Sequence, residues 1–97
     1  MPSICDIAIC SLIVKQILSF ASNDDINMLK QVRFKHVIRK GQQCVCIHTS
    51  QLKIYISKHN DAIIGKYDVD IHQNQLITKR IVLYNELCKC IINSIRE

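Results

Sequence analysis

Apolar residues in the first twenty positions follow helical spacing. Residues 3–6 (Ser-Ile-Cys-Asp) resemble a capping box with Asp in the last position, so a helix is expected from Ser3 to about Ala21. This helix is apolar nearly all round, which is typical of a helix that lies at the centre of a fold or is buried against another chain. A polar break follows at residues 22–25, and a second, short helix is expected from Asp25 to about Lys30.

From Gln31 onward the pattern changes to alternation of apolar and polar residues, which indicates strands. Turn-forming residues separate the alternating runs and predict four strands, at 31–39, 44–49, 52–57 and 63–72. The segment 76–83 fits either a fifth strand or the start of the closing helix. A helix from about Lys79 is favoured; if the segment is a strand, Asn85 would cap a shorter helix ending near Arg96.

This order of elements predicts an α+β fold. The 97 residues suffice for a single domain, 1–97, with a modest core. The expected architecture is a small two-layer sandwich, an antiparallel β-meander of about four strands covered by the N-terminal and C-terminal helices. Alternation places a largely polar set on the opposite face of the sheet: Arg33, Lys35, Arg39, Lys53, Tyr55, Lys66, Asp68, Asp70 and His72.

The charge is unevenly distributed along the chain. The formal net charge is +5, and all eight acidic residues lie outside the segment 26–60. That segment holds seven cations: Lys30, Arg33, Lys35, Arg39, Lys40, Lys53 and Lys58. Cations around an exposed aromatic ring on a sheet are a common means of holding single-stranded nucleic acid. The candidate residues for such binding are Arg33, Lys35, Arg39, Lys40, Lys53 and Tyr55. Aromatic residues make up 5% and Trp is absent, so any RNA or DNA binding should be electrostatic and weakly sequence-specific.

The six cysteines are expected to be reduced thiols. The N-terminus lacks the positive segment that precedes a secretory signal, so we expect a reducing intracellular compartment, the cytoplasm or nucleus. Strand alternation would put Cys44, Cys46 and His48 on one face as candidate soft metal ligands, but a fourth ligand is missing. Small buried hydrophobic side chains are the favoured interpretation of the cysteines, without a bound metal.

Catalytic and membrane-spanning patterns are missing from the sequence. It contains no dinucleotide, P-loop, nucleophile-elbow or zinc-protease motif, and its 2 glycines hardly suffice for a phosphate-binding loop. The first apolar run is shorter than the roughly 20 residues of a membrane span. We therefore expect no enzyme activity, no cofactor, no small-molecule substrate and no membrane span.

The leading hypothesis is a non-enzymatic interaction protein, a homodimer or a subunit bound to a protein partner. Its expected contacts are apolar sheet surfaces and the first helix, through Ile9, Leu12, Ile13 and Ile17. The alternative hypothesis is a basic nucleic-acid-binding protein that uses segment 26–60. The two are compatible, because a dimer would double the basic surface. The isoleucine-rich composition without catalytic motifs is typical of small viral accessory proteins.

Overall fold

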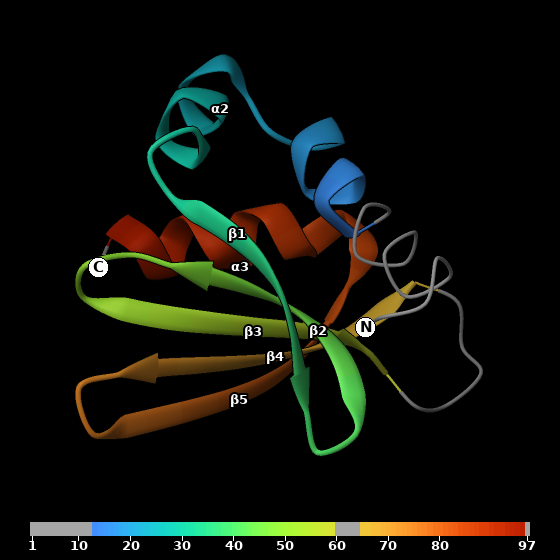
Figure 1. The fold of residues 1–97 in the computed structure, drawn as a ribbon. Helices are drawn as coiled ribbons and strands as arrows, with labels where there is room; N and C mark the ends of the chain where they lie inside the picture. Colours follow the sequence, from blue (N-terminus) through green and yellow to red (C-terminus); the bar gives the residue numbers. More distant parts are fainter. Residues whose placement is uncertain (1–12, 60–64, 97) are drawn as a thin grey trace.

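Five antiparallel strands form one sheet, and helices pack on one side of it (Figure 1). The computed structural model describes residues 13–59 and 65–96. Neighbouring strands in the sheet are also neighbours in the sequence. The strands are β1 (Arg33–Arg39), β2 (Gln42–His48), β3 (Leu52–Lys58), β4 (Lys66–Gln73) and β5 (Leu76–Leu83). The expected α+β class is confirmed, with five strands rather than four.

Three helical segments accompany the sheet in the described part of the chain. Residues 13–19 are helical, and α2 (Asn23–Leu29) and α3 (Tyr84–Arg96) follow. The start expected for the first helix, at Ser3, lies outside the described residues. α2 begins two residues before the expected position because Ser22 caps it: the Ser22 hydroxyl accepts from the backbone N–H of Asp25, and the Asp25 carboxylate accepts from the N–H of Ser22.

The segment 76–83 corrects the favoured sequence interpretation. It is a strand, and α3 begins only at Tyr84. All of β5 pairs with β4, from Gln73 opposite Leu76 to Lys66 opposite Leu83. Asn74, with φ 56°, allows the tight reversal between the two strands. Pairing to β4 along the full length outweighs the helical spacing that continues from Ile81 into α3.

The core lies between the helices and one face of the sheet, called here the inner face. The inner-face side chains of the middle strands are buried, as alternation predicts: Val45, Ile47, Leu52, Ile54, Ile56, Tyr67, Val69 and Ile71. They pack against Leu29 of α2 and Leu87 and Ile91 of α3.

Two expected contact residues of the first helix belong to this same core. Ile13 and Ile17 are 1% and 0% exposed within the chain. Both side chains are therefore buried in the core of the single chain. Ile9 and Leu12 lie outside the described residues.

Candidate interaction surfaces

Strand register arranges the outer face, opposite the core, in rows that cross the sheet. One row runs Arg33, His48, Lys53, His72 and Ile77 from β1 to β5. The next row runs Lys35, Cys46, Tyr55, Asp70 and Lys79. Side chains opposite each other in neighbouring strands have Cβ atoms about 5 Å apart. The face is therefore basic at the end where β1 begins, and mixed in charge farther along.

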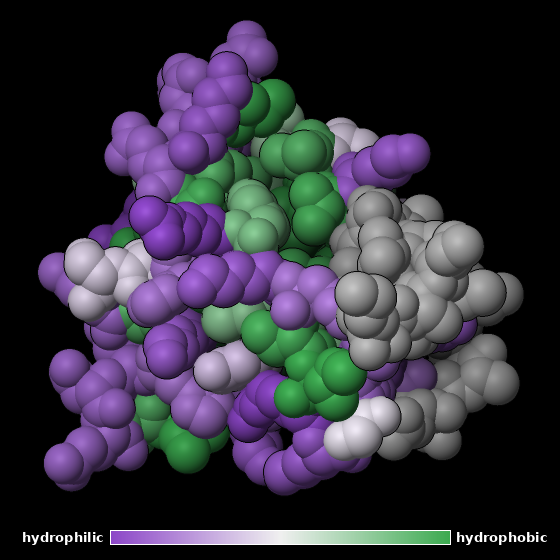
Figure 2. All heavy atoms as spheres, viewed as in Figure 1, coloured by the Kyte–Doolittle hydropathy of each residue, from purple (hydrophilic) through white to green (hydrophobic). Residues whose placement is uncertain are grey.

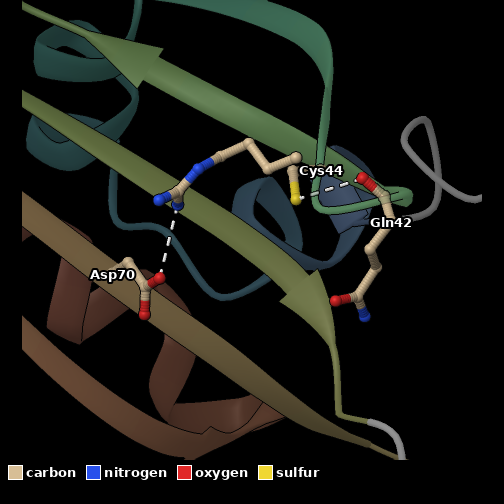
Figure 3. A network of polar contacts seen from close by, with 4 residues as sticks. Gln42, Cys44 and Asp70 are labelled. Carbon is tan, nitrogen blue, oxygen red and sulfur yellow. Dashed lines mark hydrogen bonds and ion pairs between the residues drawn. The ribbon is translucent and has the colours of Figure 1, made fainter.

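Arg39 lies across the middle of this face. Its guanidinium carbon is 4.0 Å from the centre of the Tyr55 ring, a cation–π contact. Its Nη1 is 3.3 Å from Oδ2 of Asp70 on β4 (Figure 3). The Tyr55 ring also meets His72 edge to face, with ring centres 5.1 Å apart. Arg39 and Tyr55 thus contact each other, and one face of the tyrosine ring is not available for stacking on a base.

Two thiols on the outer face are buried beneath these polar side chains. Cys44 and Cys46 are 4% and 5% exposed, and the Cys44 thiol donates to the carbonyl oxygen of Gln42 at 3.6 Å (Figure 3). Burial raises the pKa of both thiols, although the charges of Lys53 and Lys35 act in the opposite direction on Cys46. These cysteines are protonated, apolar packing residues near neutral pH.

The three candidate metal ligands predicted from the sequence all lie on strand β2. Cys44, Cys46 and His48 share the outer face of β2, as expected from alternation. Within residues 13–59 and 65–96, however, no group of three or more His, Cys, Asp or Glu side chains is placed to hold a metal ion.

A groove of about 540 Å³ opens on the outer face between the β1–β2 turn and β5. Asp68 and Asp70 line it together with Lys79. Asp68 is 2.8 Å from Nδ1 of His59, and Asp70 is paired with Arg39. Because both carboxylates already have partners in the chain, the groove does not present an acid–base pair to a substrate.

The structure separates the six nucleic-acid-binding candidates into three places. Arg33, Lys35 and Lys53 gather at one end of the outer face, Arg39 and Tyr55 contact each other, and Lys40 lies in the turn at the far end of β1. The register adds His48 and His72 to the first group. Sequence reasoning missed these histidines because only the pairing of strands shows that they share a row with Arg33 and Lys53.

The β5 edge of the sheet carries the densest exposed apolar set among the described strands. Leu76, Ile77, Ile81 and Leu83 are 68%, 55%, 60% and 44% exposed. Ile77, Ile81 and Leu83 lie on the outer face. In Figure 2 a small group of hydrophobic atoms reaches the surface at the lower left, in the region of β5 in Figure 1, and a larger group lies where the β1–β2 hairpin runs. Large apolar side chains on a sheet edge mark a surface for protein contact.

Comparison with protein-family models, with curated proteins and with solved structures finds no match to this chain. The fold and its surfaces are therefore the basis for assigning a role. Among the helices that the structure describes, none has the length and hydrophobicity needed to cross a membrane.

Proposed function

We propose that the protein is a non-enzymatic interaction protein that self-associates by pairing the β5 strands of two copies. The observation that carries the proposal is an eight-residue edge strand with four large, exposed apolar side chains. Among residues 13–59 and 65–96, one row of its backbone N–H and C=O groups has no sheet neighbour, and such a row is a template for another strand. A second copy supplies a strand of the same length and character.

The other edge of the sheet is protected against such pairing. β1 places the exposed cations Arg33 and Lys35 at alternate positions of its outer face, whereas Arg39 is paired with Asp70. Cations on an edge strand oppose edge-to-edge association, because pairing would bring like charges together and remove them from water. β5 has a single cation, Lys79, on the same face, between Ile77 and Ile81.

Charge also selects the pairing register of two β5 strands. In an antiparallel pair related by a two-fold axis, each residue lies opposite a residue of the second copy whose side chain is on the same face of the sheet. Registers centred on Lys79 or Arg80 would oppose two identical cations, which is unfavourable. A register centred on Ile81 instead places the two Ile81 side chains together and sets each Lys79 opposite Leu83 of the second copy.

Sedimentation velocity over a wide concentration range tests this proposal. The expected result is a weight-average mass that rises from 11.2 kDa at high dilution to twice that value at high concentration. A protein that stays monomeric at all concentrations would overturn the proposal.

A further inference from the structure

The basic end of the outer face forms a continuous strip. Arg33 pairs with His48, His48 with Lys53, and Lys53 with His72, so four strands contribute one basic residue each. With strands about 4.8 Å apart, the strip extends roughly 15 Å across the sheet. Lys35, one row along β1, widens it. The strip itself contains no acidic residue.

The cations of this strip are not used by the fold. Within the described parts of the chain, Arg33, Lys35 and Lys53 form no ion pair, and all three are exposed. The nearest carboxylate in the adjoining row, Asp70, is paired with Arg39. Exposed cations in a row across a sheet create a local positive potential, which attracts an anion.

His72 adds a second observation at the same place. Its Nε2 atom is buried and, among residues 13–59 and 65–96, has no hydrogen-bond partner. Leaving a buried polar atom unsatisfied costs about 1–3 kcal/mol. The ring packs edge-on against Tyr55, beside Lys53.

We propose that this strip binds the phosphate backbone of single-stranded nucleic acid. Successive phosphates of a stacked strand rise about 3.4 Å along the helix axis and lie roughly twice that distance apart along the backbone, so a strip of roughly 15 Å spans about three of them. Arg33, Lys35 and Lys53 pair with the phosphates, and the rings of His72 and Tyr55 lie beside the bases. A membrane surface binds amphipathic helices or clusters of about four to eight Lys and Arg residues. A strip with three such cations on a sheet instead matches a linear polyphosphate chain.

Fluorescence anisotropy of the full chain with labelled oligouridine and oligothymidine, in low and moderate salt, tests this inference. Three cations on a single strand predict a salt slope of about −2, equivalent to roughly a 20-fold loss of affinity from 50 to 200 mM salt. The double variant Lys35→Gln/Lys53→Gln should retain a slope of only about −0.7. Oligouridine and oligothymidine present the same phosphate backbone, so binding of either one supports the proposal.

The matched control is Lys30→Gln/Lys89→Gln, which removes the same charge from exposed positions on the helical side of the molecule. It should bind like the unmodified chain. Equal losses in the two double variants would show attraction by net charge only and would overturn the assigned site. So would the lack of binding at low salt, or salt-dependent binding to phosphatidylserine vesicles without binding to either oligonucleotide. Circular dichroism of each variant excludes loss of fold as the cause.

Discussion

The substitution Ile81→Lys is expected to abolish dimer formation at concentrations where the unmodified chain is dimeric. Ile81 is 60% exposed in the single chain, and its burial on pairing stabilises the dimer by about 1–2 kcal/mol per copy. The substitution removes this burial from both copies, a loss of about 2–4 kcal/mol, which corresponds to roughly a 30- to 1,000-fold weaker dimer. In the register centred on Ile81, the two new lysines would also face each other, which adds repulsion.

Sedimentation equilibrium of Ile81→Lys, beside Ile38→Lys as control, measures this effect. Ile38 is 58% exposed on the edge strand β1, so the control makes the same chemical change at the opposite edge of the sheet. The reasoning requires that Ile38→Lys dimerises normally. It is refuted if Ile81→Lys retains the dimer, or if the β1 variant is the one that dissociates.

Three further predictions concern stability. Gly65→Ala should lower the free energy of unfolding by about 2 kcal/mol in a urea titration. Gly65 has φ +89°, and a Cβ atom there would lie 2.7 Å from Cδ1 of Tyr84. Gly41→Ala is the control, at φ +76° with no atom within 4 Å, and should cost only about 1 kcal/mol. Equal costs would contradict the close approach. Ser22→Ala should cost about 1 kcal/mol through loss of the capping box at α2, and an unchanged urea midpoint would contradict that role. Burial raises the pKa of the four described thiols above the ordinary 9.0, so the folded chain holds their protons more tightly than the unfolded chain. The protonated thiols therefore contribute fully to folding stability below about pH 9, and this contribution is lost as the pH rises through the folded-state pKa values. A urea midpoint that does not fall between about pH 8 and pH 10 would contradict this sign.

Sequence alternation predicted the middle of the sheet because one face of each middle strand is covered. Tyr67 is buried in the core and Tyr55 lies on the outer face, as their positions in the alternating pattern required. The tight turn between β1 and β2 was also visible in the sequence. Lys40 and Gly41 both have positive φ, which is the geometry of a two-residue hairpin turn.

The β5 strand could not be recognised by the same reasoning. An edge strand with exposed residues on both faces has no burial pattern to impose alternation, and Ile81 continues the helical spacing of Leu87 and Ile91. Its identity as a strand depends on pairing with β4, which is a tertiary interaction.

The candidate surfaces could be predicted from the sequence only in part, for a related reason. Arg33, Lys35 and Lys53 were identified from charge, but their row with His48 and His72 follows from register across three strand pairs. Conversely, the apolar character of the first helix fits a core position as well as an interface. For Ile13 and Ile17, the tertiary structure shows a core position, which the sequence pattern alone does not specify.

Hydrogen–deuterium exchange, measured well below and well above the dimer dissociation constant, tests most directly that β5 is the contact. The account predicts that backbone amides in residues 76–83 gain protection at high concentration, while those in residues 33–39 are unchanged, because only the β5 edge acquires a new strand neighbour. Protection gained in residues 33–39, or no concentration-dependent change in residues 76–83, would contradict the account.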